Sequence, residues 1–213
     1  MIITKLEVEG KQKINVYIDE GFAFWLYKKE VALHGLKESD IISPTKLEDI
    51  IENTVFYRCK LKALQLLQHM DRTEKELKDR LTREVYPSEI VDRTMEYVKS
   101  FHYIDDVRYA VSYIRLKRTT KSKRQISMWL NGKGIYEETI QQAYAELNES
   151  EEGMEEFEDP EIGAIRRIVS KKCSDPSTLT KEEKLKISAS LYRKGFSSEN
   201  IRKVFSMQEF DSY

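Results

Sequence analysis

The sequence predicts a mainly α-helical protein, in which three tandem three-helix repeats form an elongated, curved array after a small antiparallel β extension at the N-terminus. Four apolar positions, with three, four and four residues between them, recur three times. These positions are Leu77, Leu81, Tyr86 and Val91, then Ile126, Leu130, Ile135 and Ile140, then Ile187, Leu191, Phe196 and Ile201. Three copies of one unit indicate a repeat protein that binds an elongated partner, rather than an enzyme with one deep pocket.

Residues 1–42 predict the small β-rich extension. Apolar residues alternate with polar ones around Leu6 and Val8, and again from Ile14 to Ile18, which is the period of half-buried strands. Turn residues follow these segments at 10–12 and 19–21, and the segment 22–26 predicts a third strand. Because so small a sheet is not stable alone, we expect it to pack on a helix.

A connecting helix is predicted over residues 43–62. Ser43 is a favourable N-cap residue, and Pro44 suits the first position of a helix. Apolar residues then follow at helical spacing from Leu47 to Leu67. We therefore expect one helix to run from the sheet into the first repeat.

The three repeats are expected at residues 63–101, 102–147 and 163–213. In each repeat the second helix opens with a capping box, in which a Ser or Thr side chain and a Glu or Gln three residues later each bond the other's backbone N–H. The pairs are Thr73 with Glu76, Ser122 with Gln125, and Thr180 with Glu183. The third box lies one turn further upstream of its apolar pattern, so the helix after Thr180 is expected to be a turn longer.

The ends of these second helices also carry a pattern. Lys133-Gly134 and Lys194-Gly195 close the helices of the second and third repeats, since glycine permits the left-handed closing conformation and lysine suits the negative helix end. The first repeat has Glu84-Val85 instead. Because a β-branched residue is disfavoured at positive φ, another turn geometry is expected there.

An acidic linker is predicted over residues 148–162. Corresponding apolar positions are offset by 49 residues between the first and second repeats and by 61 between the second and third. Much of the excess lies in residues 146–161, which hold nine acidic residues and no basic one. Such a composition predicts a solvated linker, or a hinge between repeats.

The overall composition limits the possible function classes. With 36 basic and 37 acidic residues, the chain as a whole is not a polyanion binder. Cys59 and Cys173 do not make a disulfide framework, and neither a signal peptide nor an apolar run long enough for a bilayer is present, so we expect a cytoplasmic protein.

Residues that would support catalysis are few. The sequence has no Gly-rich phosphate loop and no Gly-x-Ser-x-Gly motif, and its three histidines lack metal-ligand spacing. Asp105-Asp106 could contribute to a metal site, but capping of a helix that begins near Val107 is the stronger interpretation. The sequence therefore predicts no catalytic residue, no cofactor and no metal site.

The strongest electrostatic feature is a run of cations between two predicted helices of the second repeat, which we call the basic run. It comprises Arg115, Lys117, Arg118, Lys121, Lys123 and Arg124, with no acid between them. Mutual repulsion of these charges would be relieved by a polyanionic or acidic partner, although such runs are often only solvated surface. Further candidates for partner or DNA binding are Lys133, Arg166, Arg167, Lys171 and Lys172.

Trp129 is another candidate, because the first and third repeats carry Arg80 and Ser190 at the equivalent position. It could stack on a base or anchor a protein contact, and it could equally fill a gap between repeats. The tyrosines at helical spacing, Tyr103, Tyr109, Tyr113 and Tyr144, are expected to be core residues rather than stacking surfaces.

Three motifs resemble those of the bacterial RecX family. Ile104-Asp105-Asp106-Val107-Arg108-Tyr109-Ala110 is similar to its Leu-Asp-Asp … Arg-aromatic-Ala motif, and Leu130-Asn131-Gly132-Lys133-Gly134-Ile135 to its Leu-x-x-Lys-Gly-hydrophobe element. The segment from Ala63 to Leu77 is similar to its opening motif. The resemblance covers about Ala63 to Phe205, and the N-terminal sheet resembles the extension of longer members. His102 departs from the pattern, since glycine is usual there.

The resemblance implies a non-enzymatic regulator of the RecA recombinase, and we expect the chain to be a monomer. Such a protein would lie in the groove of the RecA filament on single-stranded DNA, inhibit filament extension, ATPase and strand exchange, and damp the SOS response. Some family members also bind DNA directly. The alternatives are a helical DNA-binding module that acts on DNA itself, or a generic helical-repeat scaffold.

Overall fold

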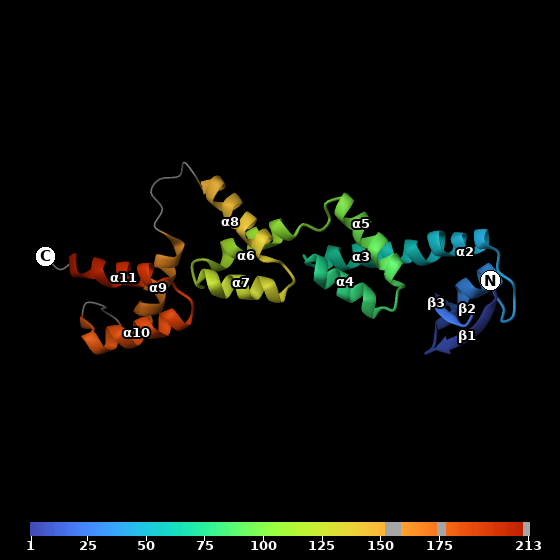
Figure 1. The fold of residues 1–213 in the computed structure, drawn as a ribbon, viewed down its shortest axis with the longest axis horizontal. Coiled ribbons are helices and arrows are strands. Elements are labelled where there is room, and N and C mark those ends of the chain that lie inside the picture. Colours follow the sequence, from blue (N-terminus) through green and yellow to red (C-terminus); the bar gives the residue numbers. More distant parts are fainter. Residues whose placement is uncertain (152–158, 174–177, 211–213) are drawn as a thin grey trace. The chain divides into compact units, whose positions relative to one another are not determined.

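The computed structural model describes residues 1–151, 159–173 and 178–210. Over these residues it is mainly helical with one small sheet, as the sequence predicts (Figure 1). The chain divides into two compact units, Met1–Asp105 and Asp106–Tyr213. None of the helices in the described part of the chain combines the length and apolar composition that a membrane span requires.

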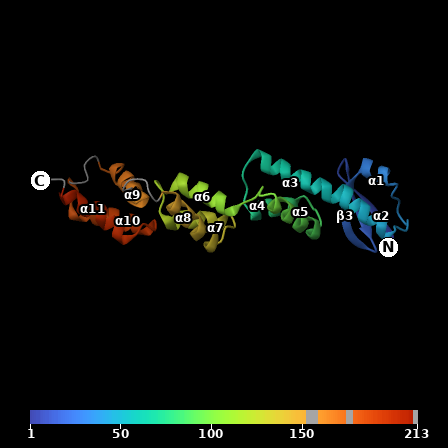
Figure 2. The ribbon, with the colours of Figure 1, turned by 90° about the horizontal axis from the view of Figure 1, so that it is seen from above.

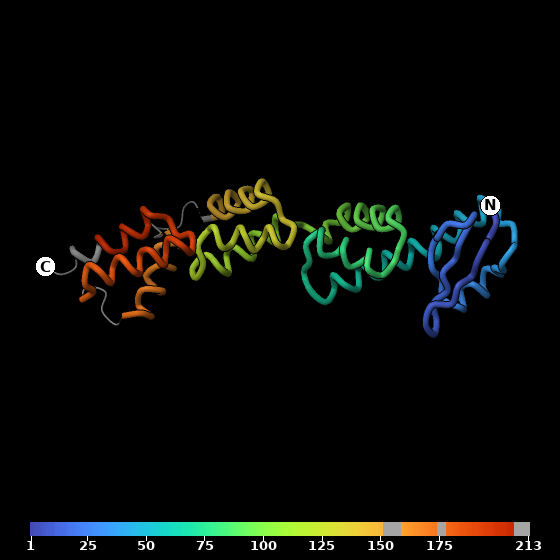
Figure 3. The backbone as a smooth tube through the Cα atoms, turned by 60° about the horizontal axis from the view of Figure 1, so that its bottom comes forward, coloured from blue at the N-terminus to red at the C-terminus, as the bar shows by residue number. Residues whose placement is uncertain are grey.

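The sheet of the first unit contains β1 (Ile3–Glu9), β2 (Lys13–Ile18) and β3 (Gly21–Tyr27), in the order β1-β2-β3 and antiparallel throughout. Figure 3 shows the three strands side by side. The predicted third strand is thus confirmed. Asp19 and Glu20 both have positive φ between β2 and β3, in a hairpin turn that short polar residues tolerate better than β-branched ones.

A helical course follows the sheet. The short helix α1 (Lys28–His34) ends at Gly35. Helix α2 (Pro44–Ile50) then begins where predicted, and the Ser43 hydroxyl accepts a hydrogen bond from the Lys46 amide. A π-helical segment, η1 (Ile51–Phe56), joins α2 to α3 (Tyr57–His69) without a break, as Figure 2 shows.

The sheet packs on this helical course and shares one core with the first repeat. Phe24, Trp25 and Leu26 of β3 are buried in the same cluster as Ile50 and Cys59. Arg58 of α3 strengthens the contact, because its guanidinium stacks 3.7 Å from the Trp25 ring and donates to the Trp25 carbonyl and to Glu30. The sheet is therefore a structural part of the first unit.

Three-helix repeats make up the remaining structure. Helix α3 is followed by α4 (Glu74–Arg83) and α5 (Ser88–Ser100). The next repeat contains α6 (Asp106–Lys117), α7 (Lys123–Gly132) and α8 (Glu137–Glu151), and the last contains α9 (Pro160–Ser170), α10 (Lys181–Arg193) and α11 (Ser198–Phe210). All three predicted capping boxes are present, and α10 is longer than α4 and α7, as predicted.

All twelve apolar positions of the threefold pattern are buried. Those of the first repeat lie in the core shared with the sheet, and those of the second and third lie in two further clusters, centred on Leu130 and Leu191. The spacing that identified the repeats is therefore the spacing of their cores.

The turn after α4 does not have the geometry that the sequence predicts. Val85 has φ +61°, close to the positive φ of Gly134 and Gly195, so the expectation of a different turn was wrong. Its amide donates to the Thr82 carbonyl, as the Gly134 amide donates to Asn131. The turn after α4 has the same geometry as the other two because the next residue, Tyr86, is buried. This geometry places the Tyr86 side chain in the core beside Trp25.

His102, where glycine is usual in the motif that the sequence resembles, adopts the left-handed conformation that glycine favours. Its φ is +54°, its amide donates to Lys99, and the Tyr103 amide donates to Val98. Histidine is among the residues that tolerate this conformation.

Helices extend into both ends of the segment that the sequence marks as an acidic linker. Helix α8 continues to Glu151, and α9 begins at Pro160 with Asp159 as its N-cap. Residues 152–158 lie outside the described part of the chain.

Candidate functional site

The basic run spans the end of α6, a short loop and the start of α7. The loop folds back tightly, since the amides of Thr120 and Lys121 both donate to the Lys117 carbonyl. Arg115 and Lys117 lie in the last turn of α6, where cations stabilise the negative helix end. Lys123 and Arg124 lie in the first turn of α7, where the helix end is positive and cations are unfavourable.

The unfavourable charges at the start of α7 have no acidic residue in the same turn to offset them. The equivalent first turns of α4 and α10 carry Glu74 with Glu76, and Glu182 with Glu183, whereas that of α7 carries no acid. A positive helix end with two added cations is a favourable environment for an anion. This charge arrangement distinguishes the second repeat from the other two.

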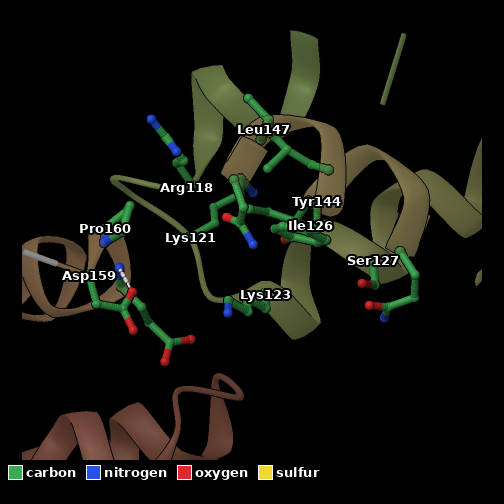
Figure 4. A pocket seen from close by; sticks show the side chains of 13 residues that line it. Arg118, Lys121, Lys123, Ile126, Ser127, Tyr144, Leu147, Asp159 and Pro160 are labelled. Carbon is green, nitrogen blue, oxygen red and sulfur yellow. Dashed lines mark hydrogen bonds between the residues drawn. The ribbon is translucent and has the colours of Figure 1, made fainter. Parts of the chain in front are cut away.

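Part of the basic run lines a cavity of about 440 Å³ within the second unit. Arg118, Lys121 and Lys123 lie along it, together with Tyr144 of α8 and the start of α9 (Figure 4). Arg115, Lys117 and Arg124 are not among the lining residues. The sequence places all six cations in one run, and the structure assigns three of them to this cavity.

Two acids at the start of α9 face the three cations of the cavity. Asp159 caps α9, accepting from the Glu161 amide, and also accepts from the Asn200 side chain at 3.0 Å. Glu161 is buried and accepts from Asn200 at 2.8 Å and from the Ser197 amide at 3.3 Å. These bonds tie both carboxylates to the start of α11, so they are held in place by the third repeat.

Tyr144 adds a buried polar group to the cavity. Its hydroxyl makes no hydrogen bond to the described residues. Burial raises the pKa of Tyr144 to about 12, with further contributions from the negative charges of Glu161 and Glu137. The Lys123 ammonium lies 5.8 Å from its ring centre. The phenol therefore stays protonated at neutral pH and can donate a hydrogen bond to an acceptor in the cavity.

Arg124 and Ser122 connect the second repeat to the third. The side chain of Arg124 packs so closely on Gly195 that a Cβ at Gly195 would lie 2.7 Å from the Cβ of Arg124. The hydroxyl of buried Ser122 caps α7 and also donates to the Lys194 carbonyl at the end of α10, at 2.6 Å. The positive end of one helix thus meets the negative end of another.

Trp129 lies against two tyrosines of its own repeat. Its ring stacks 3.8 Å from that of Tyr113 and is nearly parallel to it, and the Tyr109 ring is 6.4 Å away. The Lys133 ammonium lies 5.2 Å from the indole centre, and 36% of the Trp129 surface is exposed. Trp129 therefore fills a place within its repeat and still presents an edge to solvent.

The other candidates are distributed more widely. Tyr109, Tyr113 and Tyr144 pack on the core of the second repeat as expected, but Tyr103 is 47% exposed and stacks on Phe101, so the expectation of a core residue was wrong for it. Arg166 and Arg167 are exposed on α9, and Lys171 and Lys172 are exposed just after its end. In the described part of the chain, none of these four cations lines the cavity of the basic run.

Sequence reasoning missed Asp159, Glu161 and Tyr144 as lining residues. A local signal for the first two was present, because Asp159-Pro160 repeats the N-cap and proline order of Ser43-Pro44. The acidic composition around it outweighed that signal. In the described residues, no group of three or more His, Cys, Asp or Glu side chains is placed to hold a metal ion.

Comparisons with known proteins agree with the three-helix units. Three family models match, described as the first, second and third three-helix domains of RecX, over residues 59–97, 105–143 and 159–205. The regulatory protein RecX of Clostridioides difficile is 30% identical over 217 residues, which cover 100% of this chain and 98% of that protein. The regulatory protein RecX of Clostridium acetobutylicum is 29% identical and covers 96% of each chain.

Solved structures show the same fold. A crystal structure of regulatory protein RecX matches with a TM-score of 0.59 at 22% identity, over 95% of this chain and 98% of the other. RecX from Lactobacillus salivarius matches with the same TM-score and identity, over 73% of this chain and 97% of the other.

Proposed function

The chain belongs to the RecX family, and from this membership we propose that it is a non-enzymatic regulator of the RecA recombinase. It binds the RecA filament on single-stranded DNA and inhibits filament extension, ATPase and strand exchange in the cytoplasm. Family membership over the whole chain is the observation that carries this proposal, and the arrangement of cores and charges supports it.

The repeats support binding to a polymer. Each three-helix repeat presents a comparable set of helices, and the second and third each have a core of their own. Several moderate contacts along one filament raise the overall affinity without a strong single site. A protein of this construction suits a target whose subunits also repeat.

We assign the filament contact to the basic run. Lys123 and Arg124 add positive charge to a helix end that is already positive, with no acid in that turn. DNA phosphates or an acidic protein surface would relieve the part of this repulsion that Asp159, Glu161 and the negative end of α10 leave. Lys133, Trp129 and the four cations of 166–172 are further candidates for partner contact.

The test is a titration of RecA ATPase on single-stranded DNA. We compare the wild-type chain with a variant in which all six cations of the basic run are changed to Gln. Glutamine keeps the Cβ, Cγ and Cδ atoms of Arg124 that pack on Gly195. The matched control changes Lys28, Lys29, Lys37 and Lys46 to Gln, which removes exposed charge from the first unit at positions that are not candidates for the contact. Circular dichroism establishes that each variant is folded.

We expect inhibition by the wild-type chain and by the control, and at least about tenfold weaker inhibition by the basic-run variant, since charge-assisted contacts of this kind are each worth about 1 kcal/mol or more. Equal inhibition by all three proteins would support the proposed function and indicate that the filament contact lies outside the basic run. Normal ATPase activity at equimolar wild-type protein would contradict the proposed function.

Direct action on DNA is the second candidate function, because the same cationic helix end would attract phosphates in the absence of RecA. This function predicts binding to naked DNA whose affinity falls steeply with salt. Neutralising one phosphate-contacting cation should reduce the slope of log K against log salt by about 1. An absence of DNA binding at low salt would exclude direct action on DNA. If the chain neither inhibits RecA nor binds DNA, a generic helical-repeat scaffold remains.

A further inference from the structure

The first unit contains a hollow that the regulatory function does not use, and we call it the Trp25 pocket. It has a volume of about 380 Å³ and lies where the β2–β3 hairpin, helix α3 and the turn after α4 meet. Three cations, Lys13, Arg58 and Lys62, line it together with a single acid, Glu84. The charges of its wall are therefore mainly positive.

The acids near the pocket are already paired with arginines. The Arg58 guanidinium donates to Glu30, which is not a lining residue. Glu84 lies 2.9 Å from Arg80 and 3.7 Å from Lys62, so the lysine shares this carboxylate with an arginine that is closer to it. The charge of Lys62 is therefore only partly offset.

Lys13 has no acidic partner in the described part of the chain. Its ammonium lies 4.1 Å from the centre of the Trp25 ring, and it forms no ion pair with its cross-strand neighbour Glu9. The contact with the indole holds the ammonium at the pocket without neutralising its charge. Positive charge on two lysines thus remains for a ligand, which must itself be anionic.

Arg58 adds a buried donor that has no acceptor. Its side chain is 14% exposed, and its guanidinium stacks 3.7 Å from the Trp25 ring. The two terminal nitrogens donate to Glu30 and to the Trp25 carbonyl, but Nε makes no hydrogen bond to the described residues. Buried donors are normally satisfied, so such a group in a residue that lines a hollow indicates a site for an acceptor.

The turn after α4 holds the pocket in shape. Trp25 Nε1 donates to the Glu84 carbonyl at 2.9 Å, and the Trp25 ring lies 5.5 Å from that of Tyr86. Val85, between these two residues, has φ +61°, which is unfavourable for a β-branched side chain. Strain of this kind persists only where the surrounding structure fixes it, and it is frequent at binding sites. The pocket is therefore preorganised.

We propose that the Trp25 pocket binds a small phosphate monoester, with Lys13 and Lys62 holding the phosphate and Leu61 contacting the organic part. Such a phosphate carries a charge of about −1.5 to −2 at neutral pH and three acceptor oxygens, which match the two lysines and Arg58 Nε. A carboxylate, with one charge, would leave one lysine unmatched. Leu61 lines the pocket and is 50% exposed, so it offers an apolar surface to the rest of the ligand.

The test uses adenosine 5′-monophosphate as the probe, with adenosine and inorganic phosphate for comparison. Binding to the full chain is measured by isothermal titration calorimetry at low ionic strength, without RecA or DNA, so its outcome is independent of the proposed function. The pocket variant is Lys13→Gln with Lys62→Gln. The matched control is Lys37→Gln with Lys46→Gln, which removes the same charge from two exposed positions of the first unit outside the pocket. Circular dichroism establishes that each variant is folded.

Trp25 reports whether the ligand binds at this place. The chain has two tryptophans, so Trp129→Phe leaves only the indole of Trp25. Because the Lys13 ammonium lies 4.1 Å from the Trp25 ring, a phosphate that binds Lys13 should change the indole emission. This change should saturate with the midpoint that calorimetry gives.

We expect saturable binding of the monophosphate by the wild-type chain and the control, and binding about tenfold weaker or more by the pocket variant, which loses two charge-assisted contacts. Leu61→Ser should weaken binding of the monophosphate and leave that of inorganic phosphate unchanged. No saturable binding, equal binding by the pocket variant, or binding without a change in Trp25 emission would overturn the proposal. Adenosine or inorganic phosphate bound as tightly as the monophosphate would also overturn it, since a monoester would then not be the preferred ligand.

Discussion

Val85 lies in the turn after α4 and is followed directly by the buried Tyr86. Disfavour of β-branched residues at positive φ is a sound rule, yet Val85 adopts φ +61°. The rule describes a cost of about 1–2 kcal/mol, which the burial of Tyr86 in the following position outweighs. A local preference predicts the conformation only where the surrounding core does not require another.

Val85→Gly should therefore stabilise the protein, because glycine adopts this φ without strain. The gain of about 1–2 kcal/mol from relieved strain exceeds the loss of about 0.4–1 kcal/mol from the greater freedom of glycine in the unfolded chain. Gly134→Val, at φ +88°, should destabilise by a similar amount for the converse reason. The check is the urea midpoint of each variant; a lower midpoint for Val85→Gly would show that the turn is not strained.

Burial of Cys59 makes the free energy of unfolding of the first unit depend on pH in the alkaline range. Burial raises the pKa of this thiol from its ordinary value of 9.0 to about 11. The unfolded chain then loses its proton first as pH rises above about 9, so the free energy of unfolding falls between about pH 9 and 11. Below pH 9 both states are protonated and the group has no effect on the pH dependence.

We expect unfolding free energy to drop by about 1 kcal/mol more between pH 8 and 10 in the wild-type chain than in Cys59→Ala, measured by urea denaturation at each pH. The alanine variant leaves a small cavity, but that cost is the same at both pH values and cancels in the comparison. Identical pH dependence in Cys59→Ala and wild type would contradict the raised pKa.

At the scale of helices and strands, features encoded within a few residues were predictable. The capping boxes, the proline start at Ser43-Pro44 and the alternating strands depend on neighbours in sequence, and the structure confirms them. The contact of Arg58 with Trp25 joins residues far apart in sequence and leaves no periodic pattern. The same reason explains why the lining of the cavity was not foreseen.

Ser122 caps a helix and also joins two repeats, so its substitution measures how much the two roles together contribute to stability. Ser122 and Thr180 both accept from the backbone N–H three residues later, but only Ser122 is fully buried and donates to a carbonyl of another repeat. Loss of a cap costs about 1 kcal/mol, and loss of the part-buried hydrogen bond to the Lys194 carbonyl costs about 0.5–1.5 kcal/mol more.

Ser122→Ala should therefore destabilise by about 1.5–2.5 kcal/mol and Thr180→Ala by about 1 kcal/mol. Equilibrium unfolding in urea measures both. Thr180→Ala is the matched control, because it removes the same capping box without the bond to Lys194. Equal effects of the two substitutions would mean that the bond between the repeats contributes nothing to stability.

For the whole molecule, the threefold apolar spacing was enough to predict the repeats, because each repeat buries its own copy of the pattern. The three cores are separate clusters: one joins the sheet to the first repeat, and the second and third repeats have one each. The spacing contains no information on how neighbouring repeats meet, so the cavity at the basic run became evident only from the structure. Separate cores imply that damage to one repeat need not spread to the others.

Leu130→Asp should unfold the second repeat while the first unit stays folded. Leu130 is fully buried in the cluster of Ile126, Ile135 and Ile140, so an unpaired carboxylate there should cost about 4 kcal/mol or more, enough to open a single repeat. Hydrogen exchange with mass spectrometry should then report lost protection in residues 106–151 and retained protection in residues 1–105. Met128→Asp, on the same helix but 67% exposed, is the control and should change neither. Loss of protection throughout both units would show that the repeats fold as one cooperative body, and full protection in Leu130→Asp would place Leu130 outside the core.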